Sequence, residues 1–322
     1  MNSLSKVIQR KGKRFLFKVE TSGDHRDYLK YEELRNEIWD FRQDNLPGTR
    51  NMMCENFFYD GSSLFIAVYR ESECGGFKHL DREHLVGFSY GFVGVKDKKI
   101  GFRSKDNLLF YSQYTGVKER FRTYGLGLLI KEFQREKVIE LLGINTVTCT
   151  FDPLTGVNAY RNIHHFGMEV VAYRKDIYGD FGGLLNREDV PSDRFIMSWD
   201  LRKDIRSQER KLGSYLEEGK ILTEVEFREL RGKSGIIELE VLKKINLDVL
   251  PEIVTVEIPF DFYLMLQETE VKEREVREIP LKWRMETREA FQKLLSQNYR
   301  VVDFTSSEFE GRRRNFYILE KR

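Results

Sequence analysis

The chain has 322 residues, of which 40% are hydrophobic and 33% charged, so it can fill a core and is long enough for two ordinary domains. Its 54 basic and 52 acidic side chains leave a formal charge of +2, and no global charge favours a nucleic-acid partner. With no apolar run of membrane-spanning length, no signal-peptide core and only three scattered cysteines, we expect a cytoplasmic protein with no metal, nucleic-acid or membrane partner.

The first part of the chain predicts a strand, a helix and three more strands. Alternating basic and apolar residues indicate the first strand, and apolar residues at helical spacing between 31 and 41 indicate the helix. The loop at Gly75-Gly76 joins two strands of a predicted hairpin. The predicted strands lie at 14–19, 63–69, 85–95 and 108–117.

A second helix follows, because apolar residues recur at helical spacing over 126–142 and Gly143 is a typical helix stop. Beyond it the pattern predicts strands and one short helix up to about residue 201. The strands lie at 145–151, 169–173 and 195–201, and the short helix at 157–166.

The last third of the chain divides into a charged stretch and a compact unit. Residues 202–244 are highly charged with weak amphipathicity, which predicts a helical connector. A small β-α-β-β unit follows, with its elements at 253–258, 281–295, 299–304 and 315–320. We therefore predict a domain over 1–204, a charged helical connector over 205–250 and a small C-terminal α/β domain over 251–322.

The strongest chemical signal is the turn Arg122-Thr123-Tyr124-Gly125-Leu126-Gly127, which connects a predicted strand to a predicted helix. Helix N-terminal N–H groups and the helix dipole bind phosphate oxygens, glycines allow close approach and positive φ, and an arginine adds a cationic fork. No Gly-Lys-Ser/Thr follows, so it is not a Walker loop, and Leu128-Leu129-Ile130 excludes a dinucleotide fingerprint. The flanking strand and helix favour phosphate binding over a ligand-free helix start.

This segment resembles the GNAT acyltransferase superfamily, whose signature is a strand, an Arg/Gln-x-x-Gly-x-Gly/Ala turn and a helix. The resemblance implies an α+β fold with a mixed central sheet, splayed parallel strands and flanking helices. It also implies acetyl-CoA or CoA as co-substrate, with the turn holding the pyrophosphate and residues 114–117 pairing with the pantetheine arm. The implied coenzyme-binding residues are Thr115, Val117, Arg122, Thr123, Tyr124, Gly125, Leu126 and Gly127.

Further motifs resemble an uncharacterised group of predicted GNAT acetyltransferases and cover most of the chain apart from the connector. They lie at 111–113, 148–154, 158–159, 162, 166–167, 178–179, 193–195, 257–259, 283–284, 287–291, 299–301 and the final strand, with Gln113 where the group usually has histidine. The group has a predicted activity and no settled acceptor. One position departs from the superfamily, which often has a tyrosine as general acid where this chain has Ile163. Isoleucine cannot donate a proton, so another group does this work, the thiolate leaves unaided, or activity is lost.

Four residues are candidates for chemistry beyond the loop, and each has a structural alternative. Asp152 follows a strand end and either meets the acceptor amine or caps the next turn. Asn158 and Asn162 are one helical turn apart, so Asn158 either contacts the coenzyme or caps the helix. Tyr160 is the hydroxyl nearest to the missing acid, although it faces another direction, and Tyr178 either lines the acceptor pocket or anchors its loop.

The leading expectation is a GNAT-type N-acetyltransferase that moves an acetyl or other short acyl group from acyl-CoA to an unidentified amine by direct attack. The alternatives are a non-catalytic acyl-CoA sensor and a protein-interaction module on the same scaffold. The C-terminal unit either repeats half of the first domain, closes over the acceptor pocket or mediates a homodimer.

Overall fold

The computed structural model describes residues 4–39, 62–78, 80–179, 186–203 and 219–322, which form two compact units. Unit 1 comprises Met1–Cys149 and Asp200–Arg202, and unit 2 comprises Thr150–Trp199 and Lys203–Arg322. This division differs from the predicted domain boundaries, which stay a prediction. None of the described helices has both the length and the apolarity to cross a membrane.

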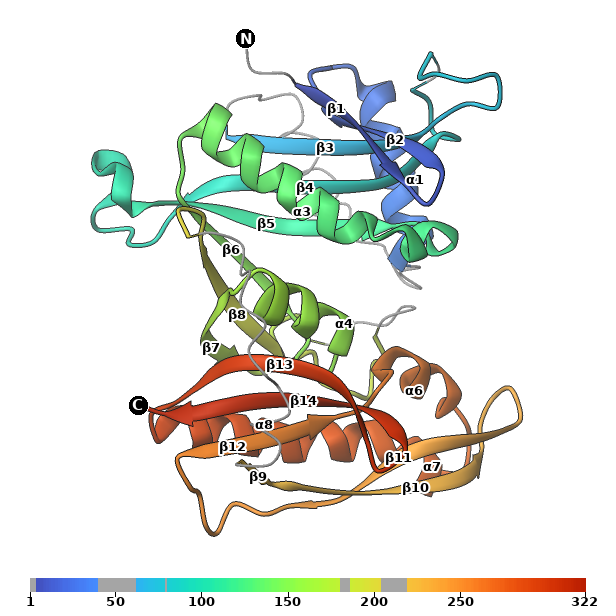
Figure 1. Cartoon of the computed structure of the whole chain (residues 1–322), viewed down its shortest axis with the longest axis vertical. Helices are drawn as coiled ribbons and strands as arrows, with labels where there is room; N and C mark the ends of the chain where they lie inside the picture. Colours follow the sequence, from blue (N-terminus) through green and yellow to red (C-terminus); the bar gives the residue numbers. More distant parts are fainter. Residues whose placement is uncertain (1–3, 40–61, 79, 180–185, 204–218) are drawn as a thin grey trace. The chain divides into compact units, whose positions relative to one another are not determined.

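Unit 1 holds the first six strands of an eight-stranded mixed sheet, in the order β1-β2-β3-β4-β5-β6 (Figure 1). The first five strands pair antiparallel, whereas β6 runs parallel to β5 and continues into unit 2. The strands are β1 (Ser5–Arg10), β2 (Lys13–Val19), β3 (Ser63–Arg70), β4 (Leu85–Val95), β5 (Leu108–Val117) and β6 (Thr146–Phe151). Their positions confirm the predicted strands, and β1 is an additional one.

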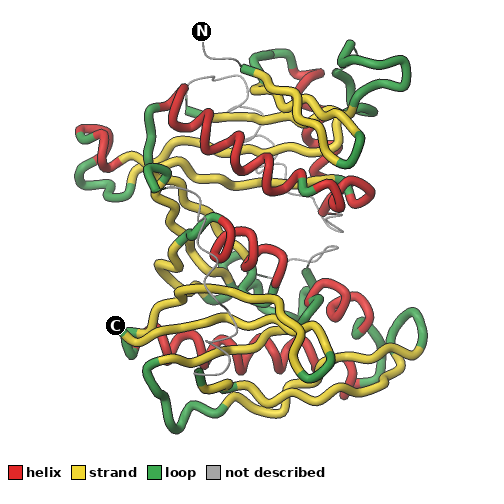
Figure 2. Tube along the Cα trace, viewed as in Figure 1, coloured by secondary structure: helices red, strands yellow, loops and turns green. Residues whose placement is uncertain are grey.

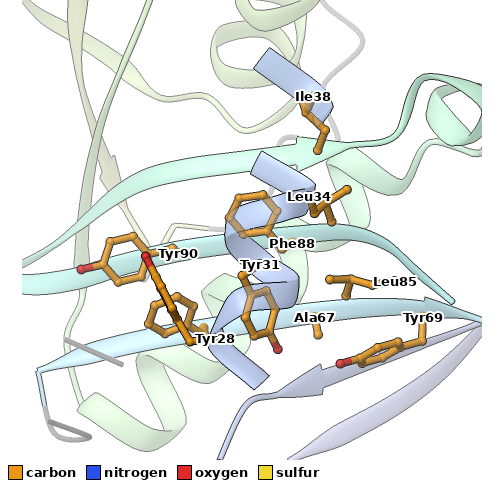
Figure 3. Close-up of a cluster of buried hydrophobic side chains, with 10 residues drawn as sticks. Tyr28, Tyr31, Leu34, Ile38, Ala67, Tyr69, Leu85, Phe88 and Tyr90 are labelled. Atoms are coloured by element: carbon orange, nitrogen blue, oxygen red, sulfur yellow. The ribbon is translucent and has the colours of Figure 1, made fainter. Parts of the chain in front are cut away.

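Two helices cover opposite faces of this sheet (Figure 1). Helix α1 (His25–Trp39) packs aromatic and aliphatic side chains onto β3 and β4, which forms the cluster drawn in Figure 3. Helix α3 (Leu126–Lys137) continues as the π-helical turn η4 (Val138–Leu142) and ends at Gly143, whose φ of 62° is the left-handed conformation expected of a glycine stop. Between them the helices cover both faces of β4 and β5, whereas β1 is largely exposed.

Unit 2 contains the last two strands of the eight-stranded sheet, a separate two-stranded hairpin and a four-stranded sheet. Its first part has the short helix α4 (Gly156–Ala159), the π-helical segment η5 (Tyr160–His165) and the antiparallel pair β7 (Glu169–Arg174) and β8 (Arg194–Asp200). The four-stranded sheet has the order β13-β14-β12-β9. Its strands are β9 (Lys220–Ile221), β12 (Ile253–Ile258), β13 (Tyr299–Phe309) and β14 (Arg312–Lys321).

Helix α8 (Ile279–Ser296) runs along one face of this four-stranded sheet (Figure 2). Its Phe291 lies edge-on to Phe195 of β8 and Tyr317 of β14, with ring centroids 5.0 and 5.2 Å apart. Two shorter helices, α6 (Phe262–Glu268) and α7 (Arg274–Arg277), precede it. The four predicted elements of the C-terminal part are found as β12, α8, β13 and β14, and they share their core with residues from the first two hundred.

The predicted helical connector is wrong for most of its length. Residues 204–218 lie outside the described part of the chain, but β10 (Thr223–Arg231) and β11 (Ile236–Ile245) form an antiparallel hairpin. Opposite charges face each other across it, for example in the Glu226–Lys243 ion pair at 3.2 Å. Cross-strand pairing of this kind stabilises charged strands that have helix-forming residues.

Candidate functional site

The turn between β5 and α3 has the backbone geometry that the sequence motif requires. The chain leaves β5 in the 3-10 turn η3 (Glu119–Tyr124), and the N–H of Gly125 donates to the carbonyl of Arg122 at 3.2 Å. Gly125 has φ 71° and ψ 18° and is the N-cap of α3. No side chain among the described residues caps this helix, so its first N–H groups point toward the turn with the positive end of the dipole.

The side chains of this turn separate into an exposed and a buried set. Arg122, Thr123 and Gly125 are exposed, whereas Val117 and Leu126 are buried. Tyr124 is half-buried, with its ring 5.4 Å from that of Phe15. A ligand at the turn would therefore meet the guanidinium and hydroxyl side chains but only the backbone of the two buried residues.

The adjoining strand is irregular next to the turn. Tyr114 pairs with Tyr90 and Ser112 with Gly91, so Gln113 is an extra residue on β5 and forms a β-bulge. Parallel pairing with β6 covers Phe110 and Tyr111. Bulges bend a strand and redirect its side chains.

A buried polar chain that the sequence did not predict connects α3 to this strand. The ammonium of Lys131 donates to the Ser112 hydroxyl at 2.6 Å, and the Gln134 amide donates to the Ser89 hydroxyl at 2.7 Å. Ser89 in turn lies 3.2 Å from the hydroxyl of Thr115. These bonds fix the rotation of α3 against the sheet, and therefore the position of the turn at its start. Their only sequence signal is a pair of polar residues within an apolar helix face.

The start of the turn lies in a basic environment. Burial lowers the pKa of Lys118, and the positive charges of Arg82, Arg120 and Arg70 lower it further. The nearby carboxylate of Glu37 raises it, but by less than the other effects lower it. The Lys118 ammonium is 3.8 Å from the Glu37 carboxylate.

Asp152, one of the predicted catalytic candidates in unit 2, is buried and forms an ion pair. One carboxylate oxygen accepts the N–H of Leu154 at 2.9 Å, and the other accepts a short hydrogen bond from Arg284 and lies 3.5 Å from Arg194. Only 6% of Asp152 and 1% of Arg284 are exposed. Burial opposes the charge of Arg284, but Asp152 raises its pKa above the ordinary arginine value. These are the contacts of a residue that holds the end of β6 against α8.

A second buried carboxylate lies in the same unit and was not predicted as a site residue. Asp193 accepts two hydrogen bonds of 2.7 Å from Arg288, one at each oxygen, and one of 2.5 Å from the hydroxyl of Tyr173. Burial raises the pKa of Asp193, but the bonds from Arg288 and Tyr173 outweigh it and the pKa is lowered. Arg284 and Arg288 are one turn apart on α8, so one helix face supplies partners to both aspartates.

The two predicted tyrosines lie in different surroundings. Tyr178 is 48% exposed, its hydroxyl is 3.2 Å from that of Thr150, and the Arg194 guanidinium is 5.0 Å from its ring. The structure therefore brings Tyr178 and Asp152 together around Arg194. Tyr160 is 43% exposed, and its ring lies tilted by 32° to that of His164, with the ring centroids 4.8 Å apart.

Two further positions of the same segment can be placed. Asn158 is half-buried, donates to the Thr155 hydroxyl at 3.0 Å and accepts from Arg161 at 2.7 Å. Ile163, at the position where the superfamily often has a tyrosine, is 1% exposed. The loop residues belong to unit 1 and the residues from Asp152 to Tyr178 to unit 2.

No protein-family model matches the chain, and no curated protein matches its sequence significantly. Similar solved structures include NAA60 of Arabidopsis thaliana in complex with acetyl-CoA, at 14% identity and a TM-score of 0.44, covering 59% of this chain and 99% of that one. They also include the ribosomal-protein-S18-alanine N-acetyltransferase of Escherichia coli, at 11% identity and a TM-score of 0.38, covering 60% and 97%. The ribosomal-protein-S5-alanine acetyltransferase of Vibrio fischeri has 10% identity and a TM-score of 0.42, covering 63% and 100%. At these values the similarity assigns no role to any residue of this chain.

Proposed function

We propose that the chain is a GNAT-type N-acetyltransferase that binds acetyl-CoA and moves its acetyl group, or another short acyl group, to an unidentified amine. The observation that carries the proposal is the turn from β5 into α3, where an Arg-x-x-Gly-x-Gly sequence has Gly125 at φ 71° before a helix N-terminus that no described side chain caps. Strand, turn and helix occur in the order that the superfamily signature requires. A cytoplasmic location and a homodimer remain predictions from the sequence.

The residues of the turn divide the work of binding a pyrophosphate. The exposed Arg122 guanidinium supplies a cationic fork, and the N–H groups from Gly125 to Gly127 supply the oriented donors of a helix start. Thr123 and Tyr124 would contact the coenzyme through side chains, and Thr115, Val117 and Leu126 chiefly through their backbone. If the coenzyme also contacts Asn158, that contact adds to the hydrogen bonds that Asn158 already makes with Thr155 and Arg161.

In the proposed reaction the neutral amine nitrogen attacks the thioester carbonyl, and the new C–N bond forms as the C–S bond breaks. The nitrogen loses one proton and the departing thiolate takes one up. Tyr178 and Tyr160 have exposed side chains that can exchange protons with solvent, whereas both oxygens of Asp152 already accept hydrogen bonds. We therefore propose Tyr178 and Tyr160, rather than Asp152, as proton-transfer groups. Asp152 would instead position Arg194 beside Tyr178.

One observation favours the second function, a coenzyme-binding protein without turnover. The residue at the usual acid position, Ile163, is apolar and buried. Loss of that acid would leave the donor site intact.

Calorimetric titration with acetyl-CoA, CoA and adenosine diphosphate tests the donor site. Wild type should bind both coenzyme forms, and Gly125→Val should abolish binding because a β-branched side chain is strained at φ 71°. Gly12→Val is a matched control, since Gly12 also has a positive φ of 76°, an open environment and a place in unit 1, but lies in the β1–β2 turn. Absence of binding to wild type would contradict both functions.

A panel of amines with detection of released thiol separates the two functions. Turnover that falls in Tyr178→Phe or Tyr160→Phe, with coenzyme affinity retained, would support the enzyme. Tight coenzyme binding without turnover of any amine would instead favour the sensor.

A further inference from the structure

The loop between β4 and β5 carries exposed apolar side chains among exposed cations. It extends beyond the strands of the sheet and contains the 3-10 turns η1 (Gly101–Arg103) and η2 (Lys105–Asn107) (Figure 1). Phe102 is 74% exposed and Ile100 is 42% exposed. The exposed basic residues around them are Lys96, Lys98, Lys99, Arg103 and Lys105.

This loop has a defined internal structure. Asn107 is 5% exposed, and its amide nitrogen donates to the carbonyls of Asp97 and Gly101, both at 2.8 Å. Its amide oxygen accepts the N–H of Asp97 at 2.9 Å, and Gly101 has φ 58°. A buried asparagine therefore organises both sides of the loop and holds Phe102 outward. Exposure of the ring is a consequence of this scaffold.

Most of the positive charge of the loop has no internal partner. The Asp97 carboxylate accepts the N–H of Lys99 at 2.7 Å, and Lys96 donates to the backbone carbonyl of Asp106 at 2.8 Å. Within the described part of the chain, no ion pair involves the four remaining cations, Lys98, Lys99, Arg103 and Lys105. The chain as a whole has a charge of only +2, so this is a local basic patch.

We propose that this loop, residues 96–107, binds the surface of an anionic lipid bilayer. An outward-facing apolar tip ringed by cations matches the bilayer interface, where the ring inserts below the headgroups and the ammonium groups meet lipid phosphates. A nucleic acid would engage the cations and could stack on Phe102, but it offers nothing to the aliphatic Ile100. The contact is peripheral, requires no spanning helix and is independent of the acyltransferase proposal. It departs from the expectation, drawn from the sequence, that the protein has no membrane partner.

Co-sedimentation with vesicles tests this proposal on the full chain. Wild type should sediment with vesicles of phosphatidylcholine and phosphatidylglycerol in equal amounts, but not with phosphatidylcholine alone. Phe102→Ser should lower the partition coefficient into anionic vesicles about tenfold. The double variant with Lys98→Glu and Lys99→Glu should lower it by a similar factor. High salt should lower the partition coefficient of wild type to the same extent, because it screens the lysine charges. All three positions are exposed, so circular dichroism and thermal unfolding should match wild type.

Ile236→Ser is the matched control, because Ile236 is 81% exposed but lies in the β10–β11 hairpin. It should sediment like wild type. Failure of wild type to bind anionic vesicles would overturn the proposal, as would binding that Phe102→Ser leaves unchanged. Binding of a single-stranded RNA, measured by fluorescence anisotropy and lost in Phe102→Ser while vesicles are ignored, would overturn it in favour of a nucleic-acid partner.

Discussion

Asp152 joins distant parts of unit 2 through a single carboxylate. It follows β6, pairs with Arg284 of α8 and lies beside Arg194 at the start of β8. A buried ion pair contributes little more to stability than an apolar pair of similar size. Removal of one partner is nevertheless strongly destabilising, because it leaves the other charge buried without a counter-charge or water around it. At the residue scale, the stability of this unit therefore depends on both members being present.

Arg284→Met should lower the free energy of unfolding by about 3 to 5 kcal/mol, because it leaves the Asp152 carboxylate buried without its main partner. Urea denaturation followed by tryptophan fluorescence suits the measurement, since Trp283 is adjacent and fully buried. Arg274→Met is the control, because Arg274 pairs with Glu278 at the surface, and its midpoint should stay close to wild type. A wild-type midpoint for Arg284→Met would show that the pair contributes nothing.

Glu20 is a second buried charge, in unit 1, and it makes stability depend on pH. Burial alone would raise its pKa, but the hydrogen bond from Tyr31 at 2.7 Å, the ammonium groups of Lys30 and Lys18, and the N–H of Ser22 lower the pKa from 4.5 to about 2. A carboxyl group with a lowered folded-state pKa stabilises the protein above its unfolded pKa. That stabilisation is lost as the pH falls from 4.5 toward about 2.

Glu20→Gln should therefore destabilise the protein at neutral pH by roughly 2 to 3 kcal/mol, and the difference from wild type should narrow below pH 4.5. Urea denaturation at a series of pH values measures it. Glu33→Gln, on the exposed side of α1, is the control and should show no such narrowing. A difference that stays constant with pH would contradict the assigned ionisation.

At the element scale, the close pairing of β4 with β5 depends on one glycine. A Cβ atom at Gly91 would lie 2.5 Å from the carbonyl oxygen of Tyr111 and closer still to the Phe110 ring, next to the bulge at Gln113. Gly91→Ala should lower the free energy of unfolding by about 1 to 3 kcal/mol, which is the usual effect of overpacking a protein core. Gly94→Ala in the same strand meets only Leu109 at 3.4 Å, so its melting temperature should stay near that of wild type. Equal melting temperatures for the two variants would refute the steric argument.

The elements that the sequence predicted correctly are those whose apolar periodicity agrees with their burial. Helix α3 has one buried face with apolar residues at helical spacing and one half-buried face, so its pattern, and the turn before it, can be recognised without a structure. The hairpin of β10 and β11 was misassigned because its Glu, Lys, Arg and Leu residues favour helices, while cross-strand pairing decides the conformation. Lys131 and Gln134 were missed because apolar periodicity alone indicates no role for polar residues on an apolar helix face. Their partners Ser112 and Ser89 lie on β5 and β4.

At the scale of the whole molecule, the compact units do not follow the order of the chain. Residues 150–199 pack with residues beyond 203, through the Asp152–Arg284 and Asp193–Arg288 pairs and the ring contacts of Phe195 with Phe291 and Tyr317. Sequence reading placed a boundary near 204 because the charged segment that follows is typical of a linker. Composition cannot reveal that α8 supplies the partner of Asp152, which lies 132 residues earlier.

A chain that ends at residue 204 should therefore retain order only in part. Without α8 and β14, Asp152 loses Arg284, Asp193 loses Arg288, and Phe195 loses two of its aromatic neighbours. Buried charges without partners and exposed aromatic rings are both unfavourable, so residues 150–199 should unfold while residues 5–149 keep their own core. Hydrogen exchange with mass spectrometry would show fast exchange in peptides from β7 and β8 and continued protection in β3 to β5, with the full chain as reference. Native protection of β7 and β8 in the shortened chain would instead establish the domain over 1–204 as an independent folding unit.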